Sequence, residues 1–482
     1  MLFHSQAFYF LNYQVLIFRF VHFYKMVLSS YKDRETSVIN HPHCEGIFFL
    51  IKIAIVDFIC IFANKIVRKM YNRIYDNYWN FRTSNTKEYT HCYHTYPAMM
   101  IPQVARTLLE RYKPTDKTEL VFDPYMGSGT TLVEASIIGI NSIGTDINPL
   151  ARLISQVKTT HYDETTILNE INHIQQHYND FDPEKVESKD FSRISNYSFW
   201  YTEDSLLRLS FLSQLINSLS PEIQDFFNVA LSETVREVSF TRHGEFKRYR
   251  MSEKSLAKFK PDVFSIFDNK LRRNLTGLIE YNQNSLPSSS KICDFNTVYN
   301  IPEEIIKPES VDIVVTSPPY GDSHTTVAYG QFSRWANEWF NFPNAKNLDN
   351  ILMGGKKKST INIDPQSIRN ELLQIKEQNG PRYLEVMSFL EDYANSMKNV
   401  ARLIRPGGRV CYVVGNRTVK SVQIPLDYFT AEIFEDSGFK HEQTIVREIP
   451  NKRMPSKTSP SNKVGESVNT MSNEYIVILK KL

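Results

Sequence analysis

After Tyr71, apolar runs of about four to eight residues alternate with helix-length segments, which is typical of a parallel α/β fold. Seven runs are predicted to be strands: residues 119–123, 142–147, 291–295, 312–316, 408–415, 443–449 and 475–479. Helices are predicted from Thr130 to Gly139 and over 425–437, where a proline opens the first turn and Gly438 follows the end. The pattern therefore predicts one sheet of about seven strands covered by helices.

Two long segments interrupt this alternation. Residues 151–290 separate the second and third predicted strands, and their parts 204–219 and 221–238 have helical apolar spacing. This segment is predicted to be a helical insertion. Residues 341–380 lack a period and carry Gly354-Gly355 before three lysines, which predicts a loop. The α/β domain is thus divided into residues 70–150 and 291–482.

The first 69 residues differ from the rest of the chain. They contain 14 Phe and Tyr residues with no helical or strand period. Residues 46–67 are apolar, but Lys52 and Asp57 would each cost about 2.5–3.5 kcal/mol at a bilayer centre, so no membrane span is expected. No signal peptide is recognisable. We interpret residues 1–69 as an atypical extension that is not part of the native protein, with translation beginning at Met70.

Composition places the chain of 482 residues among globular proteins, with 41% hydrophobic and 23% charged residues and a mean hydropathy of -0.36. The net charge of +3 is too small to indicate a nucleic-acid partner by itself. The cysteines lack the spacing of metal ligands, so neither a metal site nor a disulfide framework is expected, and a cytoplasmic location is predicted. They are Cys44, Cys60, Cys92, Cys293 and Cys411.

A glycine-containing turn follows the first predicted strand and opens a helix. Its sequence is Asp123-Pro124-Tyr125-Met126-Gly127-Ser128-Gly129-Thr130. Glycines in this position permit a tight turn and let backbone N–H groups approach a ligand. The turn lacks the lysine of a phosphate-binding loop, which argues against a nucleoside triphosphate. An ordinary strand-to-helix turn is the alternative.

Acidic residues end the next two predicted strands. Asp146 lies about 20 residues after the glycines, where a carboxylate can accept hydrogen bonds from ribose hydroxyls. Its alternative role is a helix cap before Asn148-Pro149. Asp294 is expected to bind an adenine amino group and Phe295 to lie against the ring, with a plain strand-end turn as the alternative. Together these residues indicate a cofactor that contains a nucleoside.

The fourth predicted strand ends in Ser317-Pro318-Pro319-Tyr320. Because proline cannot continue a central strand, the chain must leave the sheet in an extended conformation at its carboxyl edge, where α/β folds bind ligands. The Ser317 hydroxyl and the Pro318 carbonyl can both accept hydrogen bonds, which suits an exocyclic amino group. Tyr320 offers a flat face, and stacking on a base contributes roughly 1–3 kcal/mol.

With these segments the chain resembles the amino-methylating DNA methyltransferases, whose signatures are a DPFxGSGTT turn and a Pro-Pro-aromatic segment preceded by Ser, Asn or Asp. His94-Thr95-Tyr96-Pro97-Ala98 resembles the family's cofactor-flanking segment. The resemblance implies S-adenosyl-L-methionine as cofactor and a class I methyltransferase sheet with an antiparallel last strand. Ser317 resembles the cytosine-N4 members, and adenine-N6 methylation remains the alternative.

Under this resemblance, a flipped DNA base would place its amine at Ser317 and Pro318 and stack on Tyr320. Residues 242–273 contain ten Lys and Arg against four Asp and Glu, and two further basic clusters follow. The predicted phosphate contacts to double-stranded DNA are Arg242, Lys247, Arg248, Arg250, Lys356, Lys357, Arg447, Lys452 and Arg453. Phe332 and Trp335 are expected either to cover the base or to belong to the core.

A restriction-modification system with a partner endonuclease is the expected setting. An alternative of another class is a catalytically inactive DNA-binding specificity protein. An RNA guanine-N2 or a protein-glutamine methyltransferase could also use the segment from Ser317 to Tyr320, although no amino-terminal RNA-binding domain is recognisable.

Overall fold

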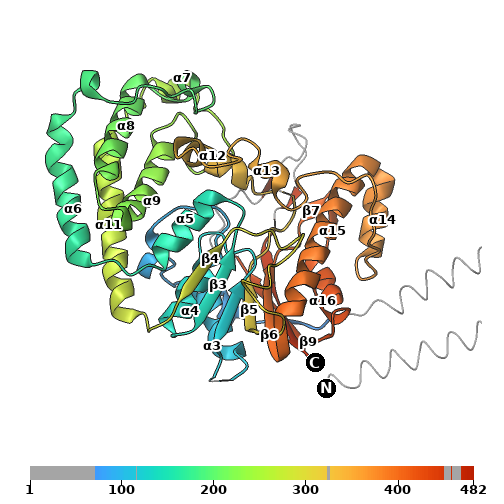
Figure 1. The fold of residues 1–482 in the computed structure, drawn as a ribbon. Coiled ribbons are helices and arrows are strands. Elements are labelled where there is room, and N and C mark those ends of the chain that lie inside the picture. Colours follow the sequence, from blue (N-terminus) through green and yellow to red (C-terminus); the bar gives the residue numbers. More distant parts are fainter. Residues whose placement is uncertain (1–70, 116, 323–325, 450–456, 459–467, 470) are drawn as a thin grey trace, which may run out of the picture. The chain divides into compact units, whose positions relative to one another are not determined.

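The centre of the fold is an eight-stranded sheet with the order β1-β9-β12-β6-β5-β2-β3-β4 (Figure 1). The computed structural model describes residues 71–482 except 116, 323–325, 450–456, 459–467 and 470. The described residues belong to one compact unit, Met70–Leu482. The predictions for residues 1–69, and for Lys452 and Arg453, lie outside the described residues.

All seven predicted strands are present, with ends that differ by a few residues. They are β2 (Leu120–Asp123), β3 (Asn141–Thr145), β4 (Ser290–Cys293), β5 (Val311–Thr316), β6 (Ile404–Val414), β9 (Phe439–Glu448) and β12 (Asn473–Lys481). The eighth strand, β1 (Arg73–Tyr75), pairs in parallel with β9 and is too short to be recognised from its apolar pattern. Two small ribbons are formed by β7 (Thr418–Val419) with β8 (Val422–Gln423), and by β10 (Lys457–Thr458) with β11 (Val468–Asn469).

The strand order confirms the predicted class I methyltransferase sheet. β12 runs antiparallel to both of its neighbours, β6 and β9, whereas the other strand pairs of the sheet are parallel. β2 lies beside β5, so the chain builds outward from β2 to β3 and β4 on one side and from β5 to β6 on the other. Ligands bind at such a switch point, outside the carboxyl ends of the strands.

Helices cover both faces of the sheet. One face packs against α3 (Pro102–Tyr112), and the other packs against α15 (Gly380–Leu403) and α16 (Leu426–Glu435) (Figure 1). Residues of β12 alternate between the two cores: Ile476 and Ile478 enter the first, and Tyr475 and Val477 enter the second. The sheet is therefore the middle layer of three.

The segment between β3 and β4 is helical, as predicted, and builds a separate apolar core. Its helices are α5 (Pro149–Lys158), α6 (Glu164–Gln176), α7 (Tyr197–Trp200), α8 (Glu203–Asn217), α9 (Pro221–Glu237), α10 (Glu253–Leu256) and α11 (Val263–Asn284). Phe332 and Trp335 of α12 (Tyr329–Trp339) are buried in this core, so their core alternative is confirmed. Helix α12 thus connects the insertion to the segment that follows Tyr320.

The predicted loop over 341–380 is partly wrong, because it contains α13 (Leu348–Ile351) and α14 (Arg369–Gln378). Helix α14 buries only Leu372 and Ile375, which is too few apolar positions to set a recognisable period. The remaining helices are α4 (Thr130–Ile137), η1 (Asn77–Asn80), η2 (Tyr89–Cys92), η3 (His177–Asp180) and η4 (Pro183–Lys185). Of the helices in the described part of the chain, none is both long and apolar enough to cross a membrane.

Candidate active site

A pocket at the carboxyl ends of the central strands joins the two predicted motifs. The lining residues that the sequence predicted are Tyr96, Tyr125, Asp146, Phe295, Ser317 and Pro319. The lining residues that it missed are Pro124, Thr145, Ile147, Asn148, Asn296, Thr297, Val298, Tyr329, Leu352 and Met353. The glycine turn and the double-proline segment therefore open onto one common cleft.

The turn after β2 depends on two glycines with left-handed backbone. Gly127 has a φ of 50° and Gly129 a φ of 76°, a region that other residues rarely adopt. A Cβ on Gly129 would lie 2.9 Å from the hydroxyl oxygen of Ser155 in α5. Gly129 thus allows α5 to approach the turn closely, and Thr130 begins α4 directly afterwards.

Asp146 at the end of β3 is tied to the glycine turn. One of its carboxylate oxygens accepts the Gly127 N–H at 3.1 Å, and the other accepts the Asn148 N–H at 2.8 Å. Burial raises the pKa of Asp146 to about 6. The N-cap of α5 is Asn148, whose side chain accepts a hydrogen bond from the Leu150 N–H. Asp146 is therefore not the cap residue, and its carboxylate faces the pocket.

Asp123 was expected to bind the cofactor, but its side chain lies outside the pocket lining. It is buried beneath the pocket and accepts the Thr316 hydroxyl at 2.5 Å and the Tyr125 N–H at 3.1 Å. Burial raises the pKa of Asp123 to about 6. Its carboxylate connects the carboxyl ends of β2 and β5, and it does not line the pocket.

Only one of the two residues predicted after β4 reaches the pocket. Phe295 lines it, whereas Asp294 is exposed and is not among its lining residues. Both residues lie after the last residue of β4, Cys293. Asn296 is the polar side chain of this segment that lines the pocket beside Phe295.

The segment from Ser317 to Tyr320 is bordered by aromatic side chains. Tyr329, the first residue of α12, stacks on Tyr96 with the ring centroids 6.1 Å apart. The Tyr96 hydroxyl accepts a hydrogen bond from the Asn148 amide at 2.9 Å. The Tyr320 hydroxyl lies 3.2 Å from Ser317 Oγ and donates to Glu474 of β12 at 3.0 Å. Tyr329 carries no signal in the sequence beyond being an aromatic residue shortly after Tyr320.

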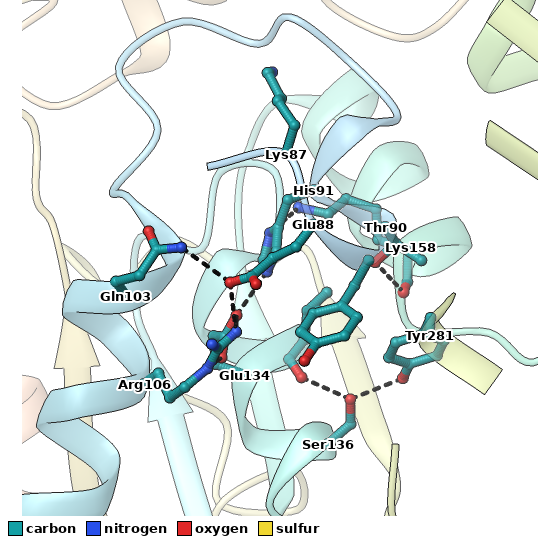
Figure 2. A network of polar contacts seen from close by, with 12 residues as sticks. Lys87, Glu88, Thr90, His91, Gln103, Arg106, Glu134, Ser136, Lys158 and Tyr281 are labelled. Carbon is teal, nitrogen blue, oxygen red and sulfur yellow. Dashed lines mark hydrogen bonds and ion pairs between the residues drawn. The ribbon is translucent and has the colours of Figure 1, made fainter. Parts of the chain in front are cut away.

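A polar network that includes the buried His91, Glu134 and Lys158 (Figure 2) reaches the glycine turn through Lys158. The Lys158 ammonium donates to the Ser128 carbonyl at 2.9 Å and lies 3.3 Å from Nδ1 of His91. Nε2 of His91 contacts Glu134 at 2.8 Å, and Arg106 binds the other oxygen of that carboxylate. Burial lowers the pKa of Lys158 to about 7 and that of His91 to about 4. Side chains of α5, α4 and α3 thereby fix the backbone of the turn.

The predicted DNA contacts fall into four groups. Arg242, Lys356 and Lys357 are exposed, and Lys247, Arg248 and Arg250 are partly buried. Arg447 is 4% exposed, and its guanidinium donates to the Trp79 carbonyl and pairs with Glu474. Because β9 carries Arg447 inward beside β12, the prediction of a phosphate contact for Arg447 is wrong. Lys452 and Arg453 lie outside the described residues.

A family model and two relatives of known name are similar to this chain. A family model described as DNA methylase (N6_N4_Mtase) matches residues 20–156. The Type II methyltransferase M.MvaI of Kocuria varians is 38% identical over 445 residues, which cover 86% of this chain and 96% of the relative. The Type II methyltransferase M.BsoBI of Geobacillus stearothermophilus is 23% identical over 412 residues, covering 74% of this chain and 80% of the relative.

Two solved structures are also similar in part. One is a protein of Thermus thermophilus described as a DNA modification methylase and complexed with S-adenosyl-L-methionine. It is 25% identical to this chain, the match covers 20% of this chain and 38% of that chain, and the TM-score is 0.15. The other is a SAM-dependent methyltransferase of Methanosarcina mazei, with 9% identity, 78% and 97% coverage and a TM-score of 0.29. On the strength of its similarity to M.MvaI along most of both sequences, the chain belongs to the N6/N4 family of amino-methylating DNA methyltransferases.

Proposed function

We propose that this protein transfers a methyl group from S-adenosyl-L-methionine to the exocyclic N4 amine of a cytosine flipped out of double-stranded DNA. The observation that carries the proposal is the shared pocket of Asp146 and Ser317, which brings a nucleoside-binding carboxylate and an amine acceptor together. Modification for a restriction-modification system is the proposed role, with an endonuclease of the same recognition sequence as partner.

The lining of the pocket fits an adenosine-containing cofactor. Each Asp146 oxygen accepts one backbone N–H and keeps a second lone pair, which a ribose hydroxyl can use. Ile147, Phe295 and Val298 supply apolar surface for a purine, and Asn296 supplies an amide that can bind its polar edge. When bound, S-adenosyl-L-methionine supplies an electrophilic methyl group on a sulfonium.

Ser317 and Pro318 handle the target amine in this proposal. The Ser317 hydroxyl oxygen and the Pro318 carbonyl accept the two amine hydrogens, so that the nitrogen lone pair points toward the cofactor side of the pocket. Tyr329 lines the pocket and offers a flat face for the extruded base, and Tyr320, which is not among the lining residues, is proposed to stack on the base from the same segment as Ser317. Alignment of this kind can supply about 7–11 kcal/mol toward the barrier, and no covalent enzyme intermediate is needed.

The basic loop 242–251 is proposed to contact the DNA backbone. It packs on α12: the Arg248 guanidinium lies 4.7 Å from the Trp335 ring, and the Arg248 backbone nitrogen lies 3.3 Å from the Gln331 side-chain oxygen. Tyr329 of the same helix lines the pocket. The exposed Lys356 and Lys357 follow the lining residue Met353 along the chain. Both basic segments are therefore connected to the rim of the pocket, which supports a DNA path across it.

Analysis of the nucleosides in methylated DNA identifies which base is modified. DNA methylated by the protein with radiolabelled cofactor is digested to nucleosides, and the label is expected in N4-methyl-2′-deoxycytidine. Label in N6-methyladenine nucleoside would overturn the cytosine assignment and leave methyl transfer to an exocyclic amine in place. Ser317→Ala is expected to bind cofactor normally and to lose about 100-fold or more of the transfer rate. Full activity of Ser317→Ala would overturn the role given to this hydroxyl.

A further inference from the structure

A chain of three hydrogen-bonded side chains leads from the catalytic serine to the last strand of the sheet. Ser317 Oγ and the Tyr320 hydroxyl are 3.2 Å apart, and the Tyr320 hydroxyl is 3.0 Å from one carboxylate oxygen of Glu474. The other carboxylate oxygen of Glu474 is bound by Arg447. Glu474 belongs to β12, at 154 residues from Tyr320, so the sequence order gives no hint of this contact.

The direction of the hydrogen bonds follows from the chemistry of each group. A carboxylate that is paired with an arginine can only accept, so the single hydroxyl hydrogen of Tyr320 is donated to Glu474. The Tyr320 oxygen is then left with lone pairs alone, and Ser317 must donate its own hydrogen to it. Burial, followed by the Glu474 charge, raises the pKa of Tyr320 well above its ordinary value, so this hydroxyl stays protonated.

As a result, the Ser317 hydroxyl has only lone pairs left for further hydrogen bonds. An isolated serine hydroxyl can rotate and present either its hydrogen or its lone pairs to a neighbour. Once its hydrogen is committed to Tyr320, Ser317 can only accept from a group in the pocket. The target amine donates its hydrogens, so the group that orients it for methyl transfer must be a hydrogen-bond acceptor.

We propose that Glu474 is a positioning residue, which acts through Tyr320 to hold Ser317 as a hydrogen-bond acceptor toward the target amine. This inference rests on the proposed function and assigns a role in it to a residue outside both signature motifs.

Packing around these three side chains fixes their positions relative to one another. A Cβ on Gly415 would lie 2.5 Å from the Tyr320 ring, so the ring fills the space above the Gly415 backbone. Arg447 is buried and also donates to the Trp79 carbonyl at 2.7 Å, which fixes the guanidinium that holds Glu474. Each end of the Tyr320 side chain therefore has a defined position.

The test uses Glu474→Gln, which keeps the shape of the side chain and changes its hydrogen-bonding capacity. The amide can donate to Tyr320, which would allow Tyr320 to donate to Ser317 and reverse the polarity of the chain. We expect the single-turnover rate of methyl transfer to fall about 10- to 100-fold, with the cofactor Kd and the DNA Kd within about twofold of wild type. Glu442→Gln, which removes the charge of another Arg–Glu pair of the same sheet, is the control and should keep the rate.

Tyr320→Phe is the second variant, because it interrupts the chain without touching the pair of Glu474 and Arg447. It should lose rate to a similar extent, and it carries the test if Glu474→Gln does not fold. A wild-type rate in either folded variant would overturn the inference.

A double-mutant cycle separates the positioning role from a general structural effect. Because Glu474 acts only through Ser317, Glu474→Gln should cause no further loss of rate in the Ser317→Ala background. An additional loss of the full single-variant size would contradict the positioning role. Full activity of Ser317→Ala would instead refute the proposed function, so the two failures are distinguishable.

Discussion

The Thr316 hydroxyl donates a hydrogen bond of 2.5 Å to the Asp123 carboxylate. These residues end β5 and β2, which are neighbours in the sheet although 193 positions separate them in the sequence. Asp123 opens the glycine turn, and Thr316 precedes Ser317. This buried bond therefore joins the two motifs at the carboxyl ends of neighbouring strands.

Removal of this bond should cost stability in a pH-dependent way. Burial raises the pKa of Asp123 to about 6, and the Thr316 hydroxyl opposes this rise because it stabilises the ionised form. A carboxyl group with a raised pKa favours the folded state below its unfolded pKa, and this contribution is lost as the pH rises through about 6. Thr316→Val should lower the free energy of unfolding by about 1–3 kcal/mol at pH 8 and by less at pH 5, measured by urea denaturation.

Thr145→Val is the matched control for that comparison. Thr145 is also buried at a strand end, but its hydroxyl donates to the Phe295 carbonyl, which does not titrate. Its loss of stability should be equal at the two pH values. Equal losses for Thr316→Val at pH 5 and pH 8 would contradict the role given to the ionised Asp123.

Cofactor binding should depend on the ionisation of Asp146. Burial raises the pKa of this carboxyl to about 6, and the ionised form is the stronger acceptor for ribose hydroxyls. The affinity for S-adenosyl-L-methionine, measured by calorimetry, should therefore rise up to about tenfold between pH 5 and pH 7 and change little above pH 7.

Asp146→Asn should bind weakly across this range and lose the pH dependence, whereas the exposed Asp294→Asn should behave as wild type. A pH dependence that persists unchanged in Asp146→Asn would assign it to another group.

Gly129 and Gly438 offer a direct comparison of strain and steric clash. Both have positive φ, of 76° and 87°, so alanine costs about 1–2 kcal/mol of backbone strain at either position. A Cβ at Gly129 would also meet Ser155, whereas one at Gly438 would meet nothing within 4 Å. Gly129→Ala should therefore lower the melting temperature more than Gly438→Ala and weaken cofactor binding. Equal effects would show that the approach of α5 is unimportant.

The basic loop can be tested through the salt dependence of DNA binding. Arg242→Gln with Lys247→Gln should weaken binding to all sequences and reduce the slope of log K against log salt by up to about 2, while cofactor affinity is unchanged. Lys117→Gln with Lys307→Gln is the control, because these exposed lysines precede β2 and β5 at the opposite edge of the sheet. An unchanged slope for the loop variant, measured by fluorescence anisotropy, would exclude the proposed path.

Features that depend on neighbouring residues could be predicted from the sequence. Apolar runs set the seven longer strands, glycines permit the turn after Asp123, and the double proline ends β5, because each acts on the local backbone. The lining by Asp146, Phe295 and Ser317 also follows, since strand ends meet at one edge of a parallel sheet. The three-residue strand β1 and the helix α14 have too few buried positions to be recognised.

Contacts between distant segments could not be predicted in this way. The basic appearance of the segment around Arg447 suggested a phosphate contact, but β9 lies beside β12 and pairs this residue with Glu474. The same placement of β12 brings Glu474 to Tyr320. The glycine turn and the segment from Ser317 to Tyr320 are each formed by consecutive residues, so both motifs, and the family that they indicate, can be recognised from the sequence alone. Which side chains face them depends on strand order and on packing across the sheet, and these arise only when the whole chain is folded.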